Sequence, residues 1–573
     1  METLIDASLG LLPLDVLIFG QVVDVYRGVI FDGYIGVKGG LIVYVGSRPK
    51  PSLERIDASE NYILPAYIDG HIHVESTLMT PSAFAKAVIP RGTCCVIADP
   101  HEIANVLGLE GIKFMIEDST RTPLKLYFMI PSSVPSTKLE TSGAEIGLKE
   151  IRVLKGFKRV LGLGEVMNYL GVIGKDKDTL DKIRVCHGMV IDGHAPGLRG
   201  EMLCAYILAG IGSDHEVLDA EEASEKLSLG MWVMIREGST AKSIARLKGV
   251  ISKGCPERVM LVTDDRHADD IVAEGHIDHC LRRAVEEGID PVDAVKMVTL
   301  KPSEYFGLRT LGGISPGKSA DIVIVDNLRN FNAKFVLIDG KLVARDGKYL
   351  YAAEVLRRDI RLGRVNVGDI STRDLQIRHP NIKYGTVKVR VIGLVEGQIF
   401  TEEEHHEVSV IDGAARPNLD KDILKICVVE RHRGSGRIGL GFVRGFGLKS
   451  GAIASTVAHD SHNIIAVGVG DGDIYTAILR LRDMNGGFVV VDGGRVISEL
   501  PLPVAGLMSN LDAEEISAKI RDLREATNRL GCRIKDPFMA LSFLSLPVIP
   551  KLKITDYGLI DSERLVVVSP FLD

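Results

Sequence analysis

Short runs of apolar residues recur between residues 66 and 265, and each run ends in polar side chains before a helix-like segment begins. The runs lack the strict apolar–polar alternation of a sheet with one solvated face, so they are typical of parallel strands buried on both faces. Eight such units predict an α/β fold, a (β/α)8 TIM-like barrel over residues 66–305. An open, doubly wound sheet is the alternative. The eight runs end at His73, Glu102, Pro131, Glu165, His194, Glu216, Glu237 and Asp265.

Both flanks of this region predict short strands interrupted by glycine. Residues 1–65 and 306–355 both predict short strands of this kind, so we expect them to pair into one small β-domain beside the barrel. Residues 356–384 are rich in charge and are expected to form a linker. Residues 385–573 predict a C-terminal α+β domain, with strands at 387–395, 423–429 and 487–492 and a helix at 513–530.

Composition excludes several classes of protein. The 573 residues carry 69 Lys+Arg and 76 Asp+Glu, a net charge of −7, which argues against a nucleic-acid partner. No apolar run reaches the roughly 20 residues that span a bilayer. The first six residues carry the acidic side chains Glu2 and Asp6, where a signal peptide would carry basic ones. The eight cysteines form no CxxC pair and are typical of reduced core cysteines. A cytoplasmic protein that binds no membrane is expected.

The predicted strand ends carry groups that bind metal ions. His71 and His73 are two residues apart on one strand, so their side chains point to the same side. In a barrel, the carboxyl ends of all eight strands meet at one face, where the chemistry takes place. Imidazole and carboxylate groups gathered there could hold two divalent cations. The six candidate ligands are His71, His73, Glu165, His194, His215 and Asp264.

These residues resemble the metal ligands of the amidohydrolase superfamily. Longer motifs narrow the resemblance to adenine deaminases of the bacterial and archaeal type, and it extends over nearly the whole chain. The motifs are Gly70-His71-Ile72-His73-Val74-Glu75-Ser76, Ala98-Asp99-Pro100-His101-Glu102-Ile103-Ala104-Asn105-Val106, Thr263-Asp264-Asp265-Arg266-His267 and Ala458-His459-Asp460-Ser461-His462-Asn463.

The resemblance implies an arrangement of the ligands. The first two histidines would bind one cation together with Asp264, and His194 and His215 would bind the second. Glu165 would bridge them, where many relatives use a carbamylated lysine. The resemblance also implies Mn²⁺ or Fe²⁺, with Zn²⁺ possible, and a site rich in carboxylates is compatible with such harder ions.

The reaction implied is the hydrolytic deamination of adenine to hypoxanthine and ammonia, a step of purine salvage, by a metal-bound hydroxide in a binuclear site. Asp264 would take the proton of the hydroxide and pass it to the departing amine. A second acid must protonate ring N1, and Glu237, Glu102 and Asp265 stay open as candidates. A homo-oligomer is expected, with the purine as small-molecule substrate.

Four further polar residues are expected to bind the substrate: Glu75, Asp99, His101 and Glu102. The last three are too polar for a plain barrel core, although a structural salt-bridged cluster is the alternative reading. The segment from His459 to Asn463 either closes over the substrate or forms an internally bonded turn of the C-terminal domain. Gly434 to Gly439 matches G-x-G-x-x-G but predicts a loop, because glycines follow where a helix is needed.

Two alternative functions stay open. Another amidohydrolase could act on a different amino-heterocycle or a cyclic amide, because metal ligands alone do not select the ring. A scaffold that has lost activity is disfavoured, since all six expected ligand positions are filled.

Overall fold

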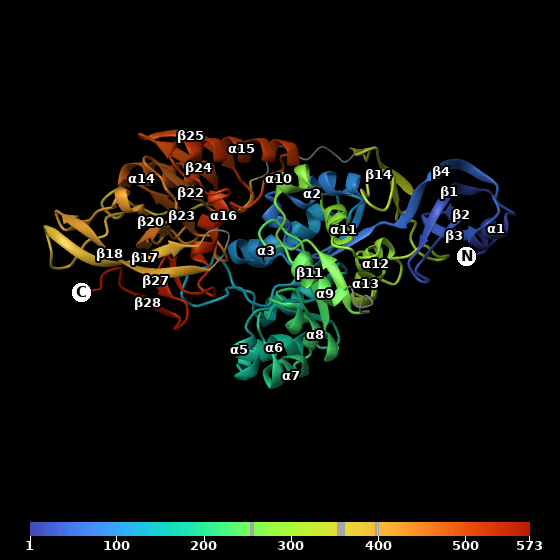
Figure 1. The fold of residues 1–573 in the computed structure, drawn as a ribbon, viewed down its shortest axis with the longest axis horizontal. Coiled ribbons are helices and arrows are strands. Elements are labelled where there is room, and N and C mark those ends of the chain that lie inside the picture. Colours follow the sequence, from blue (N-terminus) through green and yellow to red (C-terminus); the bar gives the residue numbers. More distant parts are fainter. Residues whose placement is uncertain (252–256, 352–360, 396–397, 399, 573) are drawn as a thin grey trace. The chain divides into compact units, whose positions relative to one another are not determined.

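The computed structural model describes residues 1–251, 257–351, 361–395, 398 and 400–572. These residues form two compact units (Figure 1). The barrel unit holds residues 1–100, 113–133 and 147–356, and the C-terminal unit holds residues 101–112, 134–146 and 357–573. Residues 101–112 and 134–146 thus group with the C-terminal part of the chain, although they precede the expected linker in the sequence. Residues 356–360 of that linker lie outside the described residues.

Eight parallel strands in the described part of the barrel unit confirm the predicted barrel. They pair in chain order within two sheets, β5 to β9 and β10 to β12. The hydrogen bond from Gly212 N to Ile191 O, 2.9 Å, joins the two sheets. The first two strands are buried along their whole length, which explains why their sequences do not alternate. The strands are β5 (Tyr67–Ile72), β6 (Thr93–Ala98), β7 (Lys125–Ile130), β8 (Val160–Val166), β9 (Val190–Gly193), β10 (Ser213–Asp214), β11 (Trp232–Arg236) and β12 (Val259–Val262).

A buried carboxylate closes the barrel between β12 and β5. Asp69 of β5 accepts hydrogen bonds from the backbone N–H of Thr263, 3.2 Å, and from its hydroxyl. His276 Nε2 lies 3.2 Å from the same carboxylate. Just beyond, Asp264 N donates to His71 O at 3.0 Å and His73 N donates to Asp264 O at 3.4 Å. The ends of the first and last strands are therefore fixed in register.

Helices alternate with the barrel strands in the pattern expected for this fold. They are α2 (Pro81–Val88), α3 (His101–Ser119), α4 (Leu148–Leu154), α5 (Tyr169–Ile173), α6 (Lys177–Val185), α7 (Gly200–Leu208), α8 (Ala220–Ser228), α9 (Ile244–Ile251), α10 (Ala268–Ala273), α11 (Ile277–Glu286), α12 (Pro291–Met297) and α13 (Leu300–Tyr305). Helix α3 is kinked at Gly108, which has a φ of 57°, and its residues up to Ile112 belong to the C-terminal unit.

The two flanks of the barrel pair in one sheet, as the fold prediction required. The sheet has the order β16-β15-β14-β13-β4-β1-β2-β3, and β13 runs antiparallel to β4. Ile18, Ile63 and Ile322 belong to its buried core. Its strands are β1 (Leu14–Asp24), β2 (Val29–Lys38), β3 (Leu41–Gly46), β4 (Ser52–Pro65), β13 (Ile322–Val325), β14 (Ala333–Ile338), β15 (Lys341–Arg345) and β16 (Lys348–Tyr349), with helix α1 (Glu2–Leu9) before them.

A large mixed sheet dominates the C-terminal unit, in the order β19-β18-β17-β21-β20-β23-β22-β24-β25. Helix α14 packs against β22, β23 and β24, and α15 packs against β24 and β25. The elements are β17 (Gly385–Leu394), β18 (Thr401–Ile411), β19 (Ala414–Ala415), β20 (Ile423–Val429), β21 (Ile438–Arg444), β22 (Ala452–Ser455), β23 (Ile464–Gly468), α14 (Asp471–Asp483), β24 (Gly487–Asp492), β25 (Arg495–Pro501), α15 (Ala513–Arg529), α16 (Pro537–Ser542), β26 (Leu552–Thr555), β27 (Gly558–Asp561) and β28 (Val566–Val568).

The glycine-rich segment from Gly434 to Gly439 is a loop that leads into β21, not the start of a helix. The backbone in this segment and just before it surrounds the carboxylate of Glu430, which accepts N–H hydrogen bonds from Arg433 at 2.6 Å and from Ser435 at 2.9 Å. An internal carboxylate thus occupies the place where a phosphate would bind.

Most cysteines that the structure describes are buried, as expected, but Cys204 is exposed because it lies on the outer face of α7. Over the described ranges, no helix combines the length and the apolar character needed to cross a membrane.

A fully buried ion-pair cluster supports the sixth strand end. Lys226 of α8 lies 2.8 Å from Asp214 Oδ2 and 2.5 Å from Glu222 Oε1, and it donates to Ala195 O at 2.9 Å. Asp214 also accepts from Ala195 N at 3.1 Å. Removing one member of a buried pair leaves the other charges desolvated without compensation.

We predict that Lys226→Met lowers the free energy of unfolding by about 3–5 kcal/mol, because two buried carboxylates lose their cation. Urea denaturation followed by circular dichroism measures it. Lys248→Met is the matched control, since Lys248 pairs with Glu287 at 2.8 Å but is half exposed, and its loss costs about 1 kcal/mol or less. Equal effects of the two substitutions would contradict the prediction.

Candidate metal centre

The barrel unit brings all six predicted ligands together. Their ligand atoms form overlapping groups within 4.8 Å of one another, and all six residues lie at or just beyond strand ends. The groups are His71–His73–Glu165, His71–His215–Asp264 and Glu165–His194–His215.

Glu165, at the end of β8, lies between two pairs of histidines. Its Oε1 is 3.0 Å from His73 Nε2 and 3.6 Å from His71 Nε2. Its Oε2 is 3.0 Å from His194 Nδ1 and 3.4 Å from His215 Nε2. Each carboxylate oxygen thus faces its own imidazole pair, which is the arrangement of a carboxylate that bridges two ions.

Asp264 faces the first histidine pair with one oxygen only. Its Oδ1 lies 3.4 Å from His71 Nε2 and 3.3 Å from His73 Nε2, while its Oδ2 accepts from Arg236 Nη1 at 2.6 Å. The residue has a φ of 59°, in the left-handed region that L-residues rarely adopt. Such backbone strain is concentrated at functional sites.

The imidazole nitrogens present lone pairs to the cluster. His73 Nδ1 lies 3.0 Å from the carbonyl of Asp99 and donates to it, so the lone pair is on Nε2. His71 Nε2 is buried and makes no hydrogen bond to any residue that the structure describes. Lone pairs and carboxylate oxygens that converge in this way fit a divalent cation.

The electrostatics support this fit. Burial alone would raise the pKa of Glu165. The neighbouring histidines, chiefly His215 and His73, together have the larger, opposite effect, so the pKa lies well below its usual range. Burial likewise raises the pKa of Asp264, and Arg236 and the neighbouring histidines hold it well below normal. Burial lowers the pKa of His73, yet Glu165 and Asp264 raise it well above normal. The carboxylates therefore favour positive charge, which cations can supply in place of protons.

The carboxylate of Asp99 packs against Gly164, the residue before Glu165. A β-carbon at Gly164 would collide with this carboxylate, so only glycine leaves room for it. Glu75 is buried in a short 3₁₀ turn, Val74–Thr77, directly after His73. Both predicted substrate-binding residues therefore lie in the barrel unit beside the ligands.

His101 and Glu102, in contrast, begin helix α3 in the C-terminal unit. Glu102 lies 2.7 Å from His459 Nδ1 and also accepts from His462 Nε2. Ala458 N donates to His462 Nδ1 at 3.1 Å, so the proton of His462 must be on Nε2. This trio is therefore a hydrogen-bonded cluster, because His462 has no lone pair to offer a cation there.

The other predicted catalytic residues have different surroundings. Glu237 Oε2 accepts from Ile244 N at 3.2 Å, and its Oε1 lies 3.8 Å from Arg283. Burial raises the pKa of Glu237. Asp265 accepts from the hydroxyl of Ser76 at 2.5 Å and groups with His73 and Asp264.

Arg236 and Glu216 lie beside the candidate ligands, although the sequence motifs did not indicate a role for either residue. Arg236 ends β11 and donates to both Asp264 and Glu216. The available signal was strand alternation: Arg236 and Glu237 are neighbours and must point to opposite sides. Nothing in the sequence states which of the two faces the ligands.

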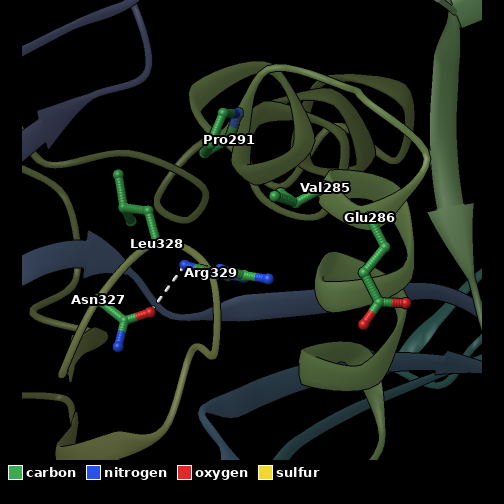
Figure 2. A pocket seen from close by; sticks show the side chains of 6 residues that line it. All are labelled: Val285, Glu286, Pro291, Asn327, Leu328 and Arg329. Atoms are coloured by element: carbon green, nitrogen blue, oxygen red, sulfur yellow. Dashed lines mark hydrogen bonds between the residues drawn. The ribbon is translucent and has the colours of Figure 1, made fainter.

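A separate surface pocket of about 570 Å³ lies in the barrel unit (Figure 2). No predicted site residue contributes to it. It is lined by Val285, Glu286, Pro291, Asn327, Leu328 and Arg329.

A barrel with a buried histidine–carboxylate cluster at its strand ends defines an amidohydrolase, and residues 62–343 match the amidohydrolase family. Residues 398–565 match the adenine deaminase C-terminal domain. The chain is 48% identical over 549 residues to the adenine deaminase of Archaeoglobus fulgidus, covering 96% of this chain and 94% of that protein. It is 42% identical over 575 residues to adenine deaminase 2 of Carboxydothermus hydrogenoformans, covering 99% of both. The chain belongs to the adenine deaminase family.

One similar solved structure is much more distant in sequence. A beta-aspartyl dipeptidase from Fervidobacterium islandicum AW-1 is 16% identical, with a TM-score of 0.45, covering 60% of this chain and 100% of that one. The family assignment rests on the full-length relatives instead.

We predict that the protein binds about two Mn²⁺ per chain and that Glu165→Gln loses at least one of them, because the amide removes the charge between the histidine pairs. Metal analysis after dialysis measures this. Glu221→Gln is the control, since the Glu221 side chain is 89% exposed. Full metal retention in Glu165→Gln would contradict a bridging role.

Proposed function

We propose that the protein hydrolyses adenine to hypoxanthine and ammonia with two divalent cations. The observation that carries the proposal is Glu165, whose two oxygens face separate histidine pairs. Membership in a family whose full-length relatives are adenine deaminases supports adenine as the substrate.

His71 and His73 with Asp264 would hold one cation, His194 and His215 the other, and Glu165 both. Cations so held supply Lewis acidity, which makes water a strong nucleophile at neutral pH. Mn²⁺ or Fe²⁺ fits the mixed imidazole and carboxylate ligands, and Zn²⁺ also accepts them.

Proton transfer falls to the aspartates after β12. Water adds to C6 of the purine, and Asp264 takes the proton that this water loses. Asp264 then gives the proton to the amino nitrogen, the C6–N bond breaks, and ammonia leaves. As the C6=O bond forms, the C6 hydroxyl returns its remaining proton to the carboxylate that protonated ring N1. Ring N1 must gain a proton as C6 becomes tetrahedral. We assign this step to Asp265, which groups with Asp264 and has one oxygen outside its bond to Ser76.

Glu237 then has a supporting role, because its carboxylate binds the backbone of the segment after β11. Glu75 and Asp99 are the proposed substrate-binding residues of the barrel unit. A substrate-binding role of His101 and Glu102 stays a prediction from the sequence. A cytoplasmic location and a homo-oligomeric state stay predictions.

We predict that Asp264→Asn lowers kcat/KM for adenine by about 10²–10⁴-fold, because an amide cannot carry the proton. Ammonia release from Mn²⁺-loaded protein measures this. Metal content must be determined alongside, since Asp264 is also a proposed ligand. An unchanged rate at full metal content would refute the proton transfer. Wild-type protein that releases no ammonia from adenine, but does so from another amino-heterocycle, would refute the substrate.

We also predict that Asp265→Asn lowers kcat by about 10²-fold, since general acid catalysis is lost, whereas Glu237→Gln stays near the wild-type kcat. The same ammonia assay compares them. If Glu237→Gln lowered kcat more than Asp265→Asn, the protonation of ring N1 would be assigned to Glu237.

A further inference from the structure

Glu216, the residue after His215, has one carboxylate oxygen in use and one without a partner. Its Oε1 accepts from Arg236 Nη2. Its Oε2 is buried and has no hydrogen-bond partner in the described ranges of the chain. The side chain as a whole is only 12% exposed. A buried acceptor without a donor is costly, so it points to a ligand that brings a donor.

Arg236 fixes this oxygen beside the metal ligands. The guanidinium is planar and rigid, and its two terminal nitrogens bind Glu216 and Asp264 at the same time. Glu216 N also donates to Asp214 Oδ1 at 2.8 Å, which ties its backbone to the buried Lys226 cluster. Backbone and side chain are thus both held, so Glu216 cannot turn away without breaking these contacts.

The second histidine pair is close to Glu216 as well. Glu216 follows His215 directly in the sequence, and Arg236 links its carboxylate to that of Asp264. Glu216 therefore lies on the same side of the barrel as the ligands and adds an acceptor that the ligand set does not use.

A free purine base has the matching donor. Its C6 and amino group must face the metal ligands, which leaves the imidazole ring, with its single N–H, toward the surrounding wall. A nucleoside lacks that N–H because the sugar replaces it.

We propose that Glu216 Oε2 accepts the imidazole-ring N–H of the substrate and so selects the free base over N9-substituted purines. This inference rests on the proposed function. A site built to hydrogen-bond a substrate N–H rejects analogues without it far more strongly than an apolar pocket does.

Glu216→Gln tests the proposal. The amide oxygen can still accept from Arg236, but its NH₂ group then faces the ring N–H, so donor meets donor. We expect KM for adenine to rise at least tenfold, while kcat changes less and metal content stays at the wild-type level. Wild-type protein should also turn over adenine at least 100-fold faster than 9-methyladenine, as kcat/KM, and Glu216→Ala should reduce this ratio at least tenfold. 7-Methyladenine is assayed in parallel, to test whether the ring N–H that Glu216 accepts is the one at N7.

Several results would overturn the proposal. Glu216→Gln with wild-type KM, or wild-type protein that accepts 9-methyladenine as well as adenine, would exclude the N–H contact. Loss of metal from Glu216→Gln would make Glu216 a support of the metal centre instead. Melting temperatures check folding. Arg236→Lys provides a second variant, because lysine lacks the rigid planar fork that holds Glu216 and Asp264 in fixed positions, and it should raise KM in the same direction.

Glu221→Gln, at an exposed position, should match the wild type throughout. Wild-type protein inactive on adenine would refute the proposed function itself and the inference with it. An active wild type with an unaffected Glu216→Gln would refute the inference alone.

Discussion

The hydrogen bonds that join the first barrel strand to the last are the constraint on which the metal centre depends. Asp69 and Thr263 are 194 residues apart, yet their buried contact sets the register between β5 and β12. That register places Asp264 Oδ1 within 3.4 Å of both His71 and His73. A shift of one residue would turn these side chains to the opposite side, because strand side chains alternate. The metal centre is thus a consequence of how the barrel closes.

Buried charges in the barrel are matched almost group by group, and the exceptions are informative. Asp69 has Thr263 and His276, and Asp214 has Lys226. Such matching is required, because an isolated charge in the interior is strongly destabilising. Where a buried polar atom has no hydrogen bond within the part of the chain that the structure describes, as at His71 Nε2 and Glu216 Oε2, the same argument points to a cation or a substrate. Groups already fixed by their neighbours need little rearrangement when the ligand arrives.

Glu102 illustrates how sequence neighbours can serve different units. Asp99 belongs to the barrel unit, whereas Glu102 belongs to the C-terminal unit and binds His459 and His462 there. Burial raises the pKa of Glu102, but the two histidines lower it to well below normal, so the carboxylate stays ionised. An ionised acceptor with two donors is poorly suited to protonating ring N1. The histidines of the segment from His459 to Asn463 are thus explained by contacts within their own unit.

The sequence by itself determined the barrel, the paired flanks and the six histidine and carboxylate positions that come together at the strand ends. Strands buried on both faces are uniformly apolar, and the barrel gathers their polar ends at one face, so a one-dimensional pattern is sufficient. Only the tertiary structure decided what each polar strand end contacts. Arg236, and not its neighbour Glu237, reaches Asp264, because the side that a residue faces depends on the register of strands distant in sequence. The assignment of residues 101–112 to the C-terminal unit was likewise hidden, since it depends on packing against segments more than 300 residues away. The local pattern of apolar and polar residues indicates which residues are buried. The contact partners of each side chain depend on how distant parts of the chain pack together.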